Sequence, residues 1–523
     1  MLTLPLDPTD DRAAPVFKDV ASCAAWLTQF QLTNLQQAHS YLLTQLNEFN
    51  RFPMQGLERY RTLEALRETV DHIQEDLAKK LVGKALPLGE HEFMTFMSIT
   101  QMWQALVTGY QRCLQAFLAG DKKLATMGAM LCERCLQYSG STIFEHIRTG
   151  YECHPKFWHQ LHDLYAFAEE QSLHEIEVKD ELERYSLSSS CRSMYLKTLL
   201  ACYARPAELS RTQLKLLDRW LVTWSKELRL ETRYSLSKGD AQPLAVDLAG
   251  KQGLQAVANT SHHAQMRYIP MVPLSKLLRV KIILLQQGTS LDQVGLGDLP
   301  SISAGIELLT FLLECWCEDD KSRAITRNLT SKPVQFGYTP EMIFALLSGK
   351  HAMPHKDTLM RKQIETFGRV LDKERSTAEP ELEGWVLDDE SMMGAKLTRH
   401  QPAPGRLNLH QLVAVRQDES QPYKLGAVAW LHVSVGGLLQ IGVGYVPGVP
   451  EPVHVQLPGG VPQAAFLMPE AVTLRTPPSL LVPRQIFQPG VMLQVIRANN
   501  DKMHVKMGIS VTRGFDYERI SYT

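Results

Sequence analysis

The chain has 523 residues, too many for a single hydrophobic core, so we expect about three or four domains. Lys plus Arg number 55 and Asp plus Glu number 56, so overall charge favours neither nucleic acid nor an anionic membrane as a partner. The nine cysteines are an odd number, and the N-terminus shows no pattern of a secretory signal peptide. These features predict a reducing, cytoplasmic setting.

Residues 1–230 carry apolar side chains at helical spacing. Leu66, Val70, Ile73 and Leu77 lie three and four positions apart and form one apolar stripe. Several such helices can bury their stripes against one another, so we expect an α-helical bundle that serves as an interaction domain. Residues 231–318 mix short strand patterns with two helix patterns and are predicted to form a mixed α/β connecting region.

Beyond residue 319, short β-branched runs alternate with glycine- and proline-containing turns. Five or six strands over residues 319–456, interrupted by a helical insert at about 340–376, predict a small antiparallel β-barrel. Residues 457–523 are predicted to be a further β-rich domain. The expected fold class is therefore α+β multidomain, with an N-terminal α-helical bundle, a small antiparallel β-barrel and a C-terminal β-rich segment.

Residues 425–450 form an uncharged run that is long enough to span a bilayer. Five glycines interrupt it before the final "PGVP", and its two halves flank a "VGG" turn signal. This pattern favours a β-hairpin, so we expect no direct membrane insertion.

A basic, hydroxyl-rich segment stands immediately before the expected barrel. Lys321, Arg323, Arg327 and Lys332 follow one another with no acidic residue between them. Two arginines four residues apart can present their planar guanidinium groups to adjacent phosphates, and arginine also stacks on purine faces. The same spacing recurs at Arg229 and Arg233, so the pair is a weak signal on its own.

A second pattern, Asp-x-Ser-x-x-Gly, is formed by Asp389, Ser391 and Gly394. A carboxylate can accept hydrogen bonds from the N1–H and amino groups of guanine, and a hydroxyl can bind a base or a sugar. We expect the glycine to permit the positive φ of a tight turn. Taken alone, the pattern is also typical of an ordinary turn in a β-hairpin.

Together, Arg-x-x-x-Arg ahead of a barrel and Asp-x-Ser-x-x-Gly within it resemble the PilZ family of cyclic di-GMP receptors. The strands "LVAVR", "LGAVAWL" and "LLQIGVGYV" follow in the order of that family, and the resemblance covers about residues 321–456. It implies a cyclic di-GMP site in which Arg323 and Arg327 hold the phosphates and stack on guanine. Asp389 and Ser391 would bind guanine and sugar, Gly394 would permit the turn, and Lys321 would assist.

The resemblance also implies a role. It points to a bacterial second-messenger effector without enzymatic activity or cofactor, which relays ligand binding to a protein partner. The partners typical of PilZ proteins are motility, type IV pilus, adhesion, exopolysaccharide or biofilm machinery. A homo-oligomer is compatible with the sequence, and a nucleic-acid partner is not expected. The alternatives are a non-binding adaptor with a degenerate PilZ barrel and a zinc-containing helical interaction protein.

The zinc alternative rests on Cys132 and Cys135, which lie three residues apart in a helix pattern. His146, Cys153, His154, His159 and His162 follow. Two such pairs could form a Cys2His2 site across two helices, although cysteines in apolar helices are more often core residues. Phosphate loops, nucleophile elbows and zinc-protease motifs are absent from the sequence, which favours binding over catalysis.

Overall fold

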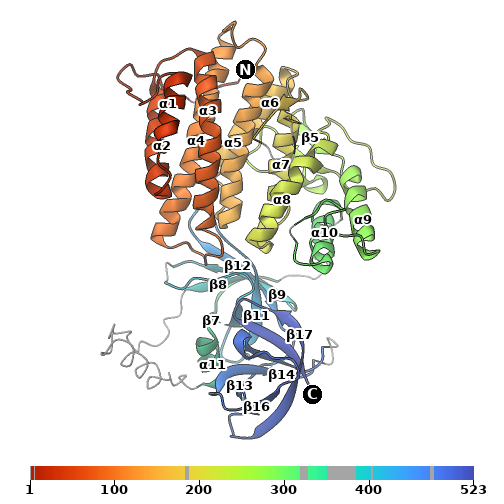
Figure 1. Cartoon of the computed structure of the whole chain (residues 1–523). Coiled ribbons are helices and arrows are strands. Elements are labelled where there is room, and N and C mark those ends of the chain that lie inside the picture. Colours follow the sequence, from red (N-terminus) through yellow and green to blue (C-terminus); the bar gives the residue numbers. More distant parts are fainter. Residues whose placement is uncertain are drawn as a thin grey trace, which may run out of the picture. The chain divides into compact units, whose positions relative to one another are not determined.

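The computed structural model describes the whole chain except residues 1, 5, 183–185, 187, 298, 319–327, 350–383, 402–403 and 472–475. It contains two compact units. The first comprises Met1–Lys84 and Leu88–Ala324, and the second comprises Ala85–Pro87 and Ile325–Thr523. The expected α+β multidomain class is confirmed, because helices dominate the first unit and strands dominate the second (Figure 1).

The first unit is built around a bundle of long helices that lie side by side (Figure 1). Its helices are α1 (Val20–Gln29), α2 (Leu35–Arg51), α3 (Gly56–Lys79), α4 (Glu90–Leu118), α5 (Gly128–Thr149), α6 (Pro155–Glu170), α7 (Cys191–Tyr203) and α8 (Arg211–Trp224). The stripe predicted on α3 is confirmed, since Leu66, Val70 and Ile73 are fully buried. Helix α4 packs against α2, α3 and α5, so the bundle core lies on both sides of it.

The remainder of the first unit combines short strands with two helices. Strands β3 (Leu244–Asp247), β4 (Gln255–Ala256) and β5 (Met266–Ile269) form a small antiparallel sheet with β3 in the centre. Helices α9 (Val272–Gln286) and α10 (Ile302–Cys317) follow and pack against each other. A separate pair, β1 (Val178–Lys179) and β2 (Ser188–Ser189), lies between α6 and α7 in the chain.

The second unit begins with a seven-stranded antiparallel sheet in the order β6-β8-β9-β12-β11-β10-β7. Its strands are β6 (Asn328–Pro333), β7 (Gln335–Gly337), β8 (Trp385–Ser391), β9 (Gly394–Arg399), β10 (Leu412–Arg416), β11 (Lys424–Val433) and β12 (Leu439–Tyr445). Strands β11 and β12 form the hairpin predicted from the uncharged run. No helix among the described residues is long and apolar enough to cross a membrane.

This sheet curls back on itself. Its two edge strands, β6 and β7, are separated in the chain by Val334 alone, so the two edges meet there. The rings of Phe336 on β7 and Trp385 on β8 accordingly lie 4.5 Å apart, and both side chains are buried with Leu387 and Leu397. The expected barrel therefore takes the form of a curled sheet in which one bent strand supplies both edges.

The C-terminal segment forms a second barrel, which is closed by hydrogen-bonded ladders in the order β13-β14-β15-β18-β17-β16. Its strands are β13 (Glu451–Gln456), β14 (Gln463–Met468), β15 (Ser479–Pro483), β16 (Met492–Ile496), β17 (Lys502–Arg513) and β18 (Tyr517–Tyr522). Strand β13 pairs with β14 and β16, so residues 451–456 belong to this barrel. Sequence reasoning left open whether the last segment is a barrel, and the structure answers that question.

Helix α11 (Pro340–Ser348) joins the two β modules of the second unit. Its fully buried Ile343 shares a core with Leu412 and Leu425 of the sheet and with Phe466 and Leu481 of the closed barrel. This helix is the described part of the predicted insert at 340–376, whose continuation from residue 350 lies outside the described residues.

Candidate functional site

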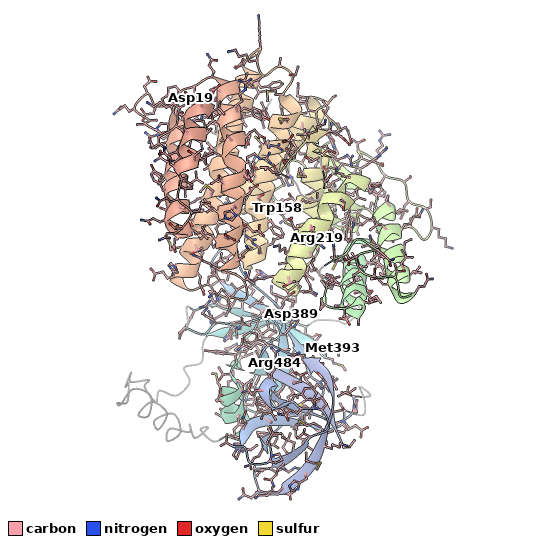
Figure 2. The ribbon with its side chains drawn as sticks, in the orientation of Figure 1. Asp19, Trp158, Arg219, Asp389, Met393 and Arg484 are labelled. Carbon is pink, nitrogen blue, oxygen red and sulfur yellow. The ribbon has the colours of Figure 1, made fainter. Side chains whose placement is uncertain are left out.

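The β8–β9 hairpin carries Asp389, Ser391 and Gly394. Ser391 pairs with Gly394 at the end of the ladder, so Met392 and Met393 form a two-residue connection. Asp389 and Met393 are labelled in Figure 2. Asp389 pairs with Lys396 on β9. The three motif residues therefore lie close together at the end of one β-hairpin, as the sequence pattern predicts.

A β-bulge at Asp388 decides which way these side chains face. Leu387 pairs with Leu397, and Asp389 pairs with the next residue, Lys396, so Asp388 is an extra residue in β8. Leu387 and Leu397 are buried in the core, and the inserted residue turns Asp389 and Ser391 to the opposite face, away from that core. Without the bulge, both motif side chains would point inward.

Glu390, which lies between the two motif residues, faces the inner side. Its carboxylate accepts hydrogen bonds from Tyr445 Oη at 2.7 Å and Lys424 Nζ at 2.9 Å. Burial, followed by the hydrogen bond to Glu390, raises the pKa of Tyr445 well above its ordinary value. These hydrogen bonds hold Glu390 on the inner face, so its neighbours Asp389 and Ser391 stay on the outer face.

Gly394 is required for a reason different from the one predicted. Its φ is not positive, so the expectation that it permits a left-handed turn is wrong. A Cβ at this position would instead lie 2.3 Å from the carbonyl oxygen of Val443 on β12. Glycine therefore allows β9 and β12 to approach each other.

The Ser391 hydroxyl supports the turn. It accepts a hydrogen bond from Met393 N at 3.3 Å and donates one to Gly394 O, also at 3.3 Å. The turn interpretation of this motif is thus correct as local structure. The hydroxyl stays half-exposed on the outer face, where a second hydrogen-bond partner could reach it.

The outer face beside Asp389 and Ser391 has a flat glycine surface at Gly394 and Gly444, bordered by Lys396, whose Nζ lies 3.6 Å from Asp388 Oδ2. Gly442 pairs with Lys396, and Gly444 pairs with Gly394, so glycines continue across β9 and β12. A Cβ at Gly444 would meet no atom within 4 Å, whereas one at Gly442 would lie 2.0 Å from Trp430 Nε1. The indole of Trp430 therefore lies against Gly442, at one side of this flat surface.

Such a surface suits a planar ligand. Asp389 and Ser391 supply hydrogen-bonding groups for a ring edge, the open position at Gly444 leaves space for its face, and Trp430 offers an aromatic surface for stacking. The sequence pattern places Trp430 only in a strand and does not predict that it lies beside the site. The bulge between Val428 and Trp430 sets its orientation, and a bulge has no clear sequence signal.

The strand that follows the arginine motif enters the sheet beside this surface. Asn328, the first residue of β6, pairs with Glu390, and Leu329 pairs with Asp389. Arg327 precedes Asn328 directly in the chain. Lys321, Arg323 and Arg327 themselves lie outside the described residues.

The rival arginine pair stands in a different setting. Arg229 and Arg233 are exposed in an irregular segment of the first unit, after the short helix η2 (Ser225–Glu227). Neither belongs to a sheet that carries an Asp-x-Ser-x-x-Gly motif.

Of the residues of the zinc alternative, Cys132, Cys135 and His162 are buried in packing positions, whereas His154 and His159 are exposed. Cys132 is fully buried in α5, and burial raises the pKa of its thiol to about 12. His162 is held by Tyr195 Oη at 2.6 Å and the carbonyl of Gln252 at 2.9 Å. Across the described part of the chain, His, Cys, Asp and Glu side chains form no group of three or more that could hold a metal ion.

Comparison with known proteins links both ends of the chain to one receptor. Residues 21–235 match the family "Cyclic-di-GMP receptor FimW, N-terminal domain", and residues 451–523 match the "FimW C-terminal beta-barrel domain". The chain is similar to FimW. Its curated relative, the cyclic-di-GMP receptor FimW of Pseudomonas aeruginosa, is 19% identical over 90% of this chain and 85% of its own length. The seven-stranded sheet with the candidate site lies between the two matched ranges.

Proposed function

We propose that the chain is a cyclic di-GMP receptor and that the curled sheet at 328–445 is a PilZ-like ligand-binding module. The observation that carries the proposal is the shared outer face of Asp389 and Ser391, next to the point where β6 enters the sheet. The similarity to a receptor named for cyclic di-GMP supports the same ligand.

Each motif residue has a role in this proposal. Arg323 and Arg327 bind the phosphates and stack on a guanine, with Lys321 as an auxiliary cation. Asp389 accepts hydrogen bonds from the guanine edge, and Ser391 binds base or sugar. Gly394 keeps the neighbouring strands close, and the Trp430 indole provides a stacking surface.

Chain connectivity makes this set of residues feasible. Asn328 pairs with Glu390, between Asp389 and Ser391, and Arg327 is its neighbour. Arg323 is four residues further upstream, within about 15 Å of extended chain. Both guanidinium groups can therefore reach a ligand that lies on the outer face.

We further propose that ligand binding is relayed to a protein partner, and that the pathway is motility, type IV pili, adhesion or exopolysaccharide. Arg323 and Arg327 lie directly upstream of β6 in the sequence, so a ligand held by both can bias the conformation of the receptor and thereby change what its partner meets. This role is one of binding and not of catalysis.

Calorimetric titration of the full chain with cyclic di-GMP tests the proposal. Arg323→Ala and Arg327→Ala should each weaken binding about tenfold to a hundredfold, because each removes a charge-assisted contact. Arg229→Ala is the matched control, since it alters an arginine of the same spacing elsewhere, and it should leave the affinity unchanged. Absence of binding by the wild-type chain at ligand concentrations of about 50 µM would refute the proposed function.

A further inference from the structure

Three large apolar side chains are exposed around the candidate site. Leu329 is 88% exposed, Met392 76% and Met393 47%. Leu329 has the highest value among the large apolar side chains of the described residues. Clustered exposure of this kind typically marks a surface that becomes covered on binding.

Strand register places these residues at the edge of the flat outer surface. Leu329 is the cross-strand partner of Asp389 and therefore shares its face. Met392 and Met393 connect Ser391 to Gly394. The three residues, which we term the apolar rim, thus adjoin both hydrogen-bonding side chains of the site.

The fold itself does not need these side chains. A two-residue hairpin connection favours Gly, Asn or Asp, and neither methionine adopts a positive φ. Met393 contributes to the turn through its backbone, which donates to Ser391 Oγ and accepts from Tyr445 N at 2.9 Å. The two thioether side chains extend into solvent beyond these bonds, and so does the Leu329 side chain.

We propose that the apolar rim packs against the face of a purine base when the site is occupied. This inference rests on the proposed function. Asp389 and Ser391 can read only the edge of a base, so its two faces need other partners. Methionine is flexible and polarizable and adapts to a flat aromatic surface, and leucine adds aliphatic area. The rim would therefore contribute affinity for purine-containing cyclic dinucleotides over ligands that lack an extended ring system.

Calorimetry on the full chain with cyclic di-GMP tests this inference. Met392→Ala and Leu329→Ala should each weaken binding about fivefold to tenfold, where tenfold corresponds to about 1.4 kcal/mol. Met392→Leu should largely restore the affinity, because it keeps the apolar area. Met492→Ala is the matched control, since Met492 on β16 is a methionine with the same 47% exposure as Met393, outside the site.

A second readout reports the contact directly. In a protein labelled with 13C at the methionine methyl groups, the Met392 and Met393 signals should move upfield on ligand addition, through the ring current of the purine. The Met492 signal should not move. Signals assigned by Met→Leu variants allow this comparison among the 19 methionines.

The outcomes separate the two proposals. If the wild-type chain binds cyclic di-GMP but the rim variants keep full affinity and the methyl signals stay in place, the rim inference is wrong and the receptor function stands. If the wild-type chain does not bind, both are wrong. Reduced affinity together with upfield methyl shifts supports the rim.

Discussion

Gly394→Ala should open the sheet between β9 and β12. The added Cβ would lie 2.3 Å from Val443 O, whereas carbon and oxygen atoms in contact stay about 3.3 Å apart. Relief requires the strands to separate by about 1 Å, which takes the neighbouring ladder hydrogen bonds beyond their normal length. The loss of about two such bonds costs about 2 kcal/mol, with up to about 1 kcal/mol offset by the reduced flexibility of the unfolded chain.

Hydrogen exchange of the full chain, followed by mass spectrometry, measures this effect locally. Peptides from residues 394–399 and 439–445 should exchange about fivefold to thirtyfold faster in Gly394→Ala than in the wild type. Gly444→Ala is the matched control, because Gly444 is the cross-strand partner of Gly394 and its Cβ would meet no atom within 4 Å. Wild-type exchange in Gly394→Ala, or equal acceleration in Gly444→Ala, would refute the reasoning.

Two further predictions concern the helical unit. Asp180 accepts hydrogen bonds from Arg67 Nη2 at 2.6 Å and Arg134 Nη1 at 3.1 Å, and all three side chains are buried. Asp180→Asn should therefore lower the free energy of unfolding by about 3 kcal/mol in chemical denaturation. The control Asp163→Asn, at an exposed position, should change it by less than about 0.5 kcal/mol. Similar losses in both variants would contradict this account. Burial lowers the pKa of His162 from 6.5 to about 4, so its contribution to stability is complete above pH 6.5 and decreases as the pH falls towards 4. Between pH 7 and pH 5, this histidine should lower the free energy of unfolding by about 2 kcal/mol. His162→Gln should therefore flatten the pH dependence of stability, whereas His159→Gln should not. An unchanged pH dependence in His162→Gln would count against this account.

The elements with strong periodic patterns were predictable from the sequence. The stripe on α3 and the uncharged hairpin β11–β12 each follow from local spacing, which does not depend on distant partners. The same holds for the closeness of Asp389, Ser391 and Gly394, since a short hairpin brings its ends together. Local patterns therefore gave the position of the candidate site in the sheet.

Features that depend on pairing between strands were not predictable. The bulge at Asp388 reverses the faces of β8, and only the pairing with β9 reveals it. The requirement for Gly394 arises from Val443, a residue about 50 positions away on a different strand. A second bulge, between Val428 and Trp430, orients the Trp430 indole, and the absence of a side chain at Gly442 on the neighbouring strand leaves space for it. Each of these is a long-range steric relation that no window of sequence contains.

The bent strand that carries both edges of the curled sheet has a consequence for how the sheet comes apart. Sheets commonly fray from their outermost strands, each of which can detach by itself. Here the outermost strands β6 and β7 are halves of one segment, and its midpoint, Val334, is buried and donates to Trp385 O at 3.0 Å. Peeling from either side must stop at this anchor. Fraying that begins at Asn328 therefore ends at Val334, and β7 at the opposite edge keeps its pairing with β10.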